Sequence, residues 1–446
     1  MLDPAGLVTD RDVLERHACD WTGKDRCLPV AVARPRSTQE VSGVLAHCHA
    51  AGWPVVVQGG LTGLAGGATP RAGELALSLE RLSGIESLDV EGGAMIVRAG
   101  ARLEQVQQAA SDVRLAFPLD FPSRGSCTIG GNIATNAGGN RVLRYGMARS
   151  LVLGLEAVLA DGTVVSSLGA VLKDNAGYDL KQLFIGTEGT LGIVTRAVLR
   201  LFPEPAERIT ALVALGSFDD LAGLLATMRR ELGATLSSFE AMWSDYFEFA
   251  LASLGQPRPF ETAHPFYAIV EVEAMDPAAD RERLENAIFG VLETGRAREA
   301  ILAGSLDEAA RLWHIRESAG EMISSLAPAA AYDVSMPLSL MERYADDVRA
   351  GVEALSLGRP FGAFGHLGDG NLHFFAGLNS PSEAAAVDAV VYGALRGHGS
   401  VSAEHGIGSL KKAWLGHTRT PAEIAVMRGL KLHLDPRGIL NPGRVI

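Results

Sequence analysis

The segment QGGLTGLAGGA, residues 58–68, carries five glycines in eleven residues and begins at the end of the apolar run WPVVVQ, residues 53–58. Such a run predicts a buried strand, and glycine lets the loop after it adopt positive φ and bring backbone amides close to an anion. A diphosphate would suit this loop, although a purely structural turn is an equal alternative from these residues alone. The loop does not match GxGxxG opening a helix, which disfavours a nicotinamide-binding Rossmann site.

Two further glycine-rich segments follow, PSRGSCTIGGNIATNAGGNRVLRYG at residues 122–146 and KDNAGYDLKQLFIGTEGTLGIVT at residues 173–195. Three such loops within about 140 residues exceed what turns alone require. In spacing and in sequence they are similar to the FAD-binding domain of the vanillyl-alcohol oxidase superfamily. The most similar branch is the FAD-linked 2-hydroxy-acid dehydrogenases, which includes the D-lactate and D-2-hydroxyglutarate dehydrogenases and the flavin subunit of glycolate oxidase. The resemblance runs from about Val30 to the closing NPGRV.

This resemblance implies an α+β fold, with a two-subdomain FAD-binding domain and an α+β cap domain on an antiparallel sheet. Hairpins are expected at Gly92–Gly93 and at Asp161–Gly162, and mixed helical and strand patterns along the chain agree with that class. We expect the FAD-binding domain at residues 1–204, the substrate cap at 205–400, and a C-terminal segment at 401–446 that returns to the FAD domain. The stretch FPEPAER, residues 202–208, is expected to be the boundary, because its two prolines should break any regular element.

The resemblance also implies which residues bind FAD. Gln58–Thr62 would cradle the pyrophosphate, the second loop would line the other phosphate and the isoalloxazine wall, and the third would contact the adenosine side. Leu61 and Thr62 stand where some relatives carry a tethering histidine, so we expect FAD to be held without a covalent bond. The residues implied to bind FAD are Gln58, Gly59, Gly60, Leu61, Thr62, Gly63, Pro122, Ser123, Gly125, Ser126, Thr128, Gly131, Asn132, Asn136, Gly138, Gly139, Glu188, Gly189, Gly192, Ile193 and Asn441.

A group of histidines and one carboxylate lies near the C-terminal end. His366 and His373 flank the turn signal Gly-Asp-Gly of residues 368–370, which would bring their imidazoles together from adjacent strand ends, and AEHGIG follows at residues 403–408. Two histidines and one carboxylate are the ligand set of a catalytic zinc site, and manganese or iron would also be tolerated. The alternative is a set of ordinary core or surface histidines. We favour a metal site formed by His366, His373 and Glu404.

Glu404 and His405 are neighbours, so in a regular strand they would point to opposite faces. Glu404 could then bind the metal while His405 faces the substrate, and the resemblance implies that His405 is the general base. A metal-bound hydroxyl loses its proton more easily, and hydride can then leave the α-carbon for the flavin. Arg316 stands at the family's arginine position and would pair with the substrate carboxylate. The alternative for Arg316 is an exposed helical residue paired with a glutamate.

Family members that act on dicarboxylates carry further polar and basic residues, and this chain has Gly320, Ala331 and Phe375 at those positions. Burying an unpaired distal carboxylate there would be costly. We therefore expect a D-2-hydroxy monocarboxylate such as D-lactate, with D-2-hydroxyglutarate as the alternative. Two other interpretations stay open: a metal-free flavin oxidase of alcohols or aryl ethers, and a non-catalytic subunit of a larger complex. The electron acceptor, whether a quinone, a flavoprotein, a cytochrome or oxygen, cannot be inferred from these residues.

Composition restricts the remaining classes. The chain has 446 residues, a formal net charge of −12 and no basic cluster, which argues against binding to nucleic acid. Its four cysteines are scattered and form no Cys-x-x-Cys pair, which argues against a disulfide framework or a thiolate zinc site. The first residues resemble neither a signal peptide nor a transit peptide. We expect a cytoplasmic protein, with peripheral membrane association and a homodimer both left open.

Overall fold

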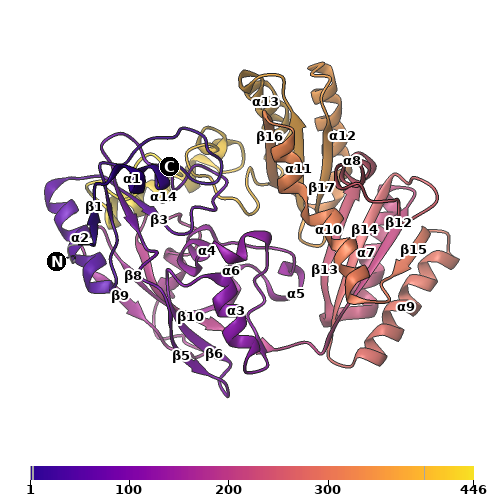
Figure 1. Ribbon diagram of the computed structural model, residues 1–446, viewed down its shortest axis with the longest axis horizontal. Coiled ribbons are helices and arrows are strands. Elements are labelled where there is room, and N and C mark those ends of the chain that lie inside the picture. Colours follow the sequence, from indigo (N-terminus) through magenta and orange to yellow (C-terminus); the bar gives the residue numbers. More distant parts are fainter. Residues whose placement is uncertain (1, 3–4, 396) are drawn as a thin grey trace. The chain divides into compact units, whose positions relative to one another are not determined.

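The computed structural model describes residues 2, 5–395 and 397–446 and contains two compact units (Figure 1). Unit 1 comprises residues 1–139, 146–204 and 404–446, and unit 2 comprises residues 140–145 and 205–403. The expected boundary at residues 204 and 205 coincides with a boundary of the units. Residues 140–145 and 401–403 differ from the expectation, because they pack with unit 2.

The first sheet of unit 1 has the order β1-β2-β4-β3. Its strands are β1 (Leu7–Val8), β2 (Ala31–Ala33), β3 (Val55–Gln58) and β4 (Leu75–Ser78), and the last three run parallel. Helix α2 (Thr38–Ala51) begins where the hydroxyl of Ser37 accepts the backbone amide of Glu40, and it ends at Gly52 with φ 67°. Leu440 of the C-terminal tail bridges Val55 in parallel, so the tail returns to this sheet.

The second sheet of unit 1 is antiparallel and has the order β5-β6-β10-β8-β9. Its strands are β5 (Ile85–Asp89), β6 (Ala94–Arg98), β8 (Val152–Val158), β9 (Val164–Ser167) and β10 (Ile193–Arg200). The hairpins expected at Gly92–Gly93 and Asp161–Gly162 are both present. The helices of this unit are α1 (Arg11–Arg16), α2, α3 (Leu103–Ser111), α4 (Ile129–Thr135), α6 (Ala148–Leu151) and α14 (Pro421–Leu434).

Unit 2 is built on a seven-stranded antiparallel sheet, as expected for the cap. In spatial order its strands are β15 (Ala297–Leu302), β12 (Glu207–Leu215), β14 (Phe266–Ala274), β13 (Leu236–Trp243), β17 (Phe361–His366), β18 (Asn371–Gly377) and β16 (Ala329–Ser335). The helices are α5 (Val142–Tyr145), α7 (Phe218–Leu232), α8 (Ser244–Leu254), α9 (Pro277–Glu293), α10 (Leu306–Glu317), α11 (Ala319–Ser325), α12 (Leu338–Ala354) and α13 (Ala384–Leu395).

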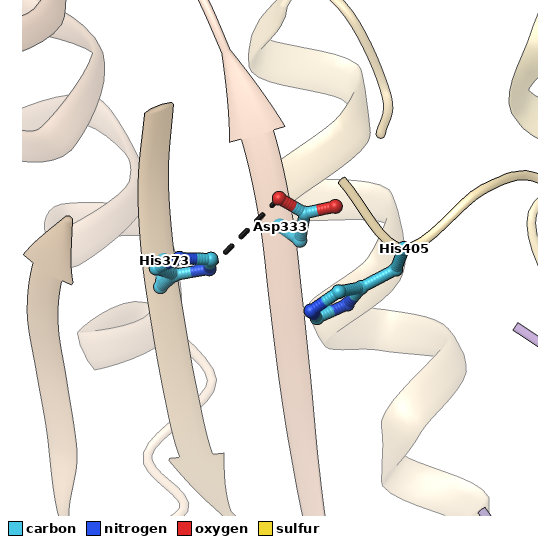
Figure 2. A group of neighbouring side chains, drawn as sticks. All are labelled: Asp333, His373 and His405. Atoms are coloured by element: carbon cyan, nitrogen blue, oxygen red, sulfur yellow. Dashed lines mark ion pairs between the residues drawn. The ribbon is translucent and has the colours of Figure 1, made fainter. Parts of the chain in front are cut away.

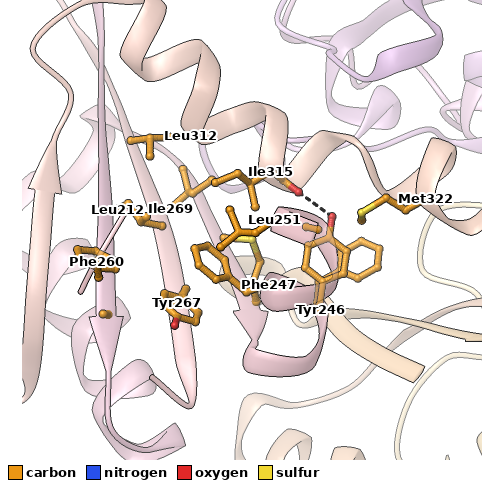
Figure 3. Packing of buried hydrophobic residues seen from close by; sticks show 14 of the residues in the cluster. Leu212, Tyr246, Phe247, Leu251, Phe260, Tyr267, Ile269, Leu312, Ile315 and Met322 are labelled. Carbon is orange, nitrogen blue, oxygen red and sulfur yellow. Dashed lines mark hydrogen bonds between the residues drawn. The ribbon is translucent and has the colours of Figure 1, made fainter. Parts of the chain in front are cut away.

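The aromatic core on one face of this sheet fixes the position of helix α10 (Figure 3). Tyr246 and Phe247 of α8 are buried there with Ile315 of α10, and the hydroxyl of Tyr246 donates to the carbonyls of Ile315 and Arg316 at 3.0 and 2.9 Å. Each large apolar side chain buried in this way contributes about 1.5–3 kcal/mol. The last turn of α10, which carries Arg316, is therefore held against the sheet.

The segment Asn140–Tyr145 forms a strap across the sheet of unit 2. Arg141 and Arg144 lie beside the carboxylate of Glu273, at 3.2 and 3.5 Å, and the hydroxyl of Tyr145 donates to it at 2.7 Å. Ser238 donates to the backbone carbonyl of Asn140 at 2.6 Å. Glu273 is only 2% exposed, so these cations compensate a charge that water does not reach.

The prolines of residues 202–208 interrupt regular structure at residues 204–206, as expected, although strands reach both ends of the stretch. Phe202–Pro203 forms strand β11, which pairs with β7 (Leu115–Ala116), and β12 begins at Glu207. Proline is tolerated here because the two strands form an isolated ribbon in which its missing N–H breaks no central ladder.

Among the described residues all four cysteines are free. None of the helices in those residues combines the length and apolar composition that crossing a bilayer requires.

Candidate functional site

In unit 1 the first two glycine-rich loops touch backbone to backbone. A Cβ on Gly60 would lie 2.0 Å from the carbonyl oxygen of Ser126, and one on Gly59 would lie 2.5 Å from the hydroxyl oxygen of Thr128. Only residues without a side chain permit this approach. The two loops named in the sequence are therefore parts of one surface.

That surface presents donors to a ligand. Within the described chain, the backbone amides of residues 60–63 donate to no backbone carbonyl, and Leu61 has a φ of 58° that turns successive amides toward one side. The hydroxyl of Thr128 is buried and has no hydrogen-bond partner among the described residues. Buried polar groups are normally paired, so an unpaired one beside free amides fits an anionic ligand such as the FAD diphosphate.

Several residues implied to bind FAD support the loops from within. The side chain of Gln58 is fully buried and bonds the ring of His17 and the carbonyl of Ala68. The amide of Asn441 accepts from the backbone of Val57 at 2.8 Å and donates to the carbonyl of Glu188 at 2.6 Å. Both side chains therefore stabilise the glycine-rich loops through hydrogen bonds within the protein.

Other implied residues also form backbone supports. Asn136, with φ 52°, ends helix α4 and accepts the amide of Arg149 at 2.9 Å. Gly139 could carry no Cβ, which would meet the carbonyl of Asp120 at 2.1 Å. The remaining residues of the implied set, among them Pro122, Ser123, Gly125, Gly131, Asn132, Gly138, Gly192 and Ile193, lie in or beside the same loops.

Glu188 holds the AEHGIG segment. Its two carboxylate oxygens accept the backbone amides of Ile407 and Gly408 at 2.7 and 2.8 Å, and Glu188 itself adopts φ 51°. Desolvation raises the pKa of Glu188 above its ordinary value of 4.5, and the two amides offset part of that rise. The resemblance implied a role in FAD binding, whereas the two hydrogen bonds of this carboxylate hold the loop of residues 407–408.

The raised pKa of Glu188 predicts a pH-dependent stability. A group whose pKa is raised by folding stabilises the fold below its unfolded-state pKa, and that stability is lost as pH rises through the folded-state pKa. We therefore compare the unfolding free energies of the wild type and Glu188→Gln. The stability advantage of the wild type should fall from about pH 4.5 upward, by at most about 1.4 kcal/mol per pH unit.

Urea unfolding of both proteins at saturating FAD measures this difference. Glu423→Gln is the matched control of opposite sign, because hydrogen bonds from Thr420 lower the pKa of Glu423. If the stability advantage of the wild type over Glu188→Gln rises with pH, the raised pKa of Glu188 is contradicted.

In unit 2 the strand register places the predicted histidines on one face of the sheet. Glu240 is paired with His366, Phe364 with His373, and His373 with Asp333. Paired residues and residues two apart share a face, so all of these side chains point toward the side covered by α8 and α10. The β17–β18 hairpin brings the two rings together as expected, with centroids 5.3 Å apart.

A buried carboxylate orients His366. The Nδ1 atom of His366 lies 2.7 Å from Glu240 Oε1, and the other oxygen of Glu240 accepts from Arg316 Nε at 2.9 Å. Arg316 is 6% exposed and its guanidinium lies over the ring of Phe364. The alternative of an exposed helical arginine is therefore wrong, although a glutamate does pair with it.

A second carboxylate, Asp333, lies beside His373 (Figure 2). Asp333 is fully buried, with Oδ1 3.9 Å from His373 Nδ1. Its Oδ2 accepts the hydroxyl of Ser402 and the backbone amide of Ala403, each at 3.1 Å. Asp333 thus fixes the point at which the chain leaves unit 2.

Glu404 and His405 follow directly, so the covalent chain keeps their Cα atoms within about 8 Å of that of Ala403. Of the expected metal ligands, His366 and His373 lie in unit 2, whereas Glu404 lies in unit 1, directly after the Ala403 that Asp333 holds. Glu404 also accepts the amide of Gly139 at 2.7 Å. Residues 403–408 form no strand, so the expected strand alternation does not separate Glu404 from His405.

The two imidazoles of unit 2 fit a pair of metal ligands, because their ring centroids lie only 5.3 Å apart and histidine nitrogens bind zinc at about 2.0–2.1 Å. Two residues before His373 in β18, Asn371 is 3% exposed, and neither polar atom of its amide has a partner among the described residues. An unpaired buried amide on the same face of the strand as His373 is a second sign of a ligand-binding position.

Sequence reasoning missed Glu240, Asp333 and Asn371. The first two lie 126 and 40 residues from the histidines that they contact, and no local pattern links them. A polar residue inside an apolar strand was the available signal, in SSFEAMW and AAAYDVS. Asn371 stood within the motif already quoted and could have been found there.

The positions expected to contact a distal carboxylate differ in setting. Gly320 and Ala331 are exposed, on α11 and β16. Phe375 is fully buried and packs against Gly362 and Tyr246 in the aromatic core. None of the three offers a charge or a side-chain hydrogen bond to a substrate.

Comparisons with known proteins identify families for both halves of the chain. Residues 29–167 match the family described as FAD binding domain, and residues 204–445 match that described as FAD linked oxidases, C-terminal domain. The chain is 40% identical to D-2-hydroxyglutarate dehydrogenase, mitochondrial, of Bos taurus, over 99% of this chain and 81% of that protein. It is 40% identical to D-2-hydroxyglutarate dehydrogenase of Xanthomonas citri pv. viticola, over 98% of this chain and 94% of that protein.

The chain belongs to the family of FAD-linked D-2-hydroxy-acid dehydrogenases. The dehydrogenase also resembles the solved structure of p-cresol methylhydroxylase with bound substrate, with a TM-score of 0.77 and 17% identity over 99% of this chain and 94% of that one. That likeness confirms the vanillyl-alcohol oxidase type of fold expected from the glycine-rich loops. FAD is therefore the cofactor of the dehydrogenase.

Proposed function

We propose that the enzyme oxidises a D-2-hydroxy acid to the 2-oxo acid with the help of a divalent metal ion, zinc or manganese, held by His366, His373 and Glu404. The observation that carries this proposal is the pair of buried imidazoles, His366 and His373, whose ring centroids lie 5.3 Å apart in unit 2. In the same unit Asp333 holds the backbone amide of Ala403, the residue before Glu404. When bound, FAD accepts the hydride from the α-carbon and the metal ion polarises the substrate hydroxyl.

The chain's own residues supply binding and proton transfer. His405 takes the proton of the substrate hydroxyl, because a neutral imidazole is a good base near neutral pH. Arg316 binds the substrate carboxylate: two of its nitrogens face Glu240, and a guanidinium has five N–H donors in all. Asn371 offers an amide beside the metal group, where it can donate to or accept from the substrate.

The nature of the substrate tail is a separate part of the proposal. Gly320, Ala331 and Phe375 offer no cation, which favours a monocarboxylate such as D-lactate or a longer 2-hydroxy acid. The relatives named D-2-hydroxyglutarate dehydrogenase make the dicarboxylate the second candidate. The electron acceptor is proposed to be a quinone, a flavoprotein or a cytochrome.

Anaerobic flavin reduction tests both parts. The purified protein is mixed with D- and L-lactate, longer D-2-hydroxy monocarboxylates and D-2-hydroxyglutarate, and loss of the oxidised flavin absorbance is followed. We expect bleaching by D but not L enantiomers, loss of the fast phase after chelator treatment, and its return with zinc or manganese. Fast reduction by D-2-hydroxyglutarate alone would overturn the monocarboxylate, and a rate unaffected by complete metal removal would overturn the metal.

A further inference from the structure

Glu240 touches both halves of the proposed substrate site. It lies in the middle of β13, is 1% exposed, and its two oxygens divide between two partners. Oε1 lies 2.7 Å from His366 Nδ1, and Oε2 lies 2.9 and 2.8 Å from Arg316 Nε and Nη2. The contacts join a candidate metal ligand to the residue proposed to bind the substrate carboxylate.

The chemistry of the carboxylate selects one form of His366. An ionised carboxylate only accepts hydrogen bonds, so His366 Nδ1 must carry the proton that it donates to Glu240. The lone pair is then on Nε2, the nitrogen that would bind a metal. A histidine ligand oriented by a carboxylate in this way has a fixed ring and a more basic donor atom.

The same carboxylate determines the direction of Arg316. With Nε and Nη2 on Glu240 and its plane over Phe364, the guanidinium has one orientation. Arg316 Nη2 also lies 3.4 Å from His366 Nε2, so the arginine and the proposed metal-binding nitrogen are neighbours. A displacement of Glu240 would disturb both.

We infer that Glu240 is a positioning residue that orients His366 for metal binding and Arg316 for the substrate carboxylate. This inference rests on the proposed function, because it requires the metal ion. It predicts that one substitution weakens two separate binding events although Glu240 contacts neither ligand.

The test compares Glu240→Gln with Glu271→Gln in FAD-loaded protein. Glu271 is the matched control: it is 3% exposed, lies on the same face of the sheet opposite Ser238, and has its own partners in Trp313 and Arg141. Metal is removed with a chelator, and the dissociation constant for zinc is measured by competition with a chromophoric chelator. The Michaelis constant for the best substrate is measured at saturating zinc.

We expect Glu240→Gln to retain FAD and to bind zinc about 10–100-fold more weakly. The Michaelis constant should rise by a similar factor, and both constants of Glu271→Gln should stay within about threefold of the wild type. If Glu240→Gln does not fold, Glu240→Asp, which keeps the charge but is too short for both partners, should show the same loss. An unchanged zinc constant in the folded variant would overturn the inference and leave the proposed function intact. A wild type that binds no zinc or manganese would overturn both.

Discussion

Gly60→Ala is expected to yield a protein that is purified largely without flavin. The new Cβ would lie 2.0 Å from the carbonyl oxygen of Ser126 and 3.0 Å from the Cα of Cys127. Both neighbours are backbone atoms, so the two glycine-rich loops must separate. Such overpacking costs about 1–3 kcal/mol, which corresponds to a loss of FAD affinity of up to roughly 100-fold. The ratio of flavin to protein absorbance measures the loss.

Gly43→Ala is the matched control for this substitution. Gly43 is exposed within helix α2 and has nothing within 4 Å of its Cβ position, so alanine there should retain FAD and stabilise the helix by about 0.5–1 kcal/mol. Full flavin content in Gly60→Ala would show that the two glycine-rich loops do not form the FAD-binding site.

His373→Ala is expected to keep FAD and to lose both the metal and turnover. His373 is one of the proposed metal ligands, and its ring centroid lies 5.3 Å from that of the second histidine ligand, His366. Loss of a metal that contributes several kcal/mol to the transition state should slow flavin reduction by at least about 100-fold. Elemental analysis and anaerobic stopped-flow reduction measure the two effects on one preparation.

His264→Ala serves as the control for His373→Ala. His264 also lies in unit 2 and pairs with a glutamate, Glu299, but it is not among the proposed metal ligands. It should retain metal and flavin reduction. A His373→Ala protein with normal metal content and normal reduction would refute the proposed ligand set, while flavin retention would show that its loss of turnover is not a folding defect.

A feature could be predicted from the sequence when the residues that cause it lie close together in the chain. The hairpins at Gly92–Gly93 and Asp161–Gly162 were predicted because a turn signal and the strands beside it are contiguous. The pair His366 and His373 was predicted for the same reason, since a short turn separates them. Glu240 and Asp333 were not, because only the register of a seven-stranded sheet brings them to these histidines.

Local sequence preference decided less where a distant partner holds the backbone. Glu404 and His405 were expected to alternate as in a strand, but Asp333 holds Ala403 before them and residues 403–408 form no strand. The prolines of residues 202–208 interrupt regular structure only at 204–206, because β7 pairs with Phe202–Pro203. The burial of Arg316 could not be inferred from its neighbours in sequence, because it depends on the aromatic core beneath α10.

The strap Asn140–Tyr145 makes the cap discontinuous in sequence, and this limits how the enzyme can be divided. A fragment of residues 205–403 contains every strand of the seven-stranded sheet but lacks Arg141, Arg144 and Tyr145. Of its present side-chain partners among the described residues, Glu273 would then retain Arg208, at 3.2 Å, and would carry a poorly compensated buried charge near the end of β14. Truncation or domain-exchange experiments on this family should therefore graft the strap together with the cap.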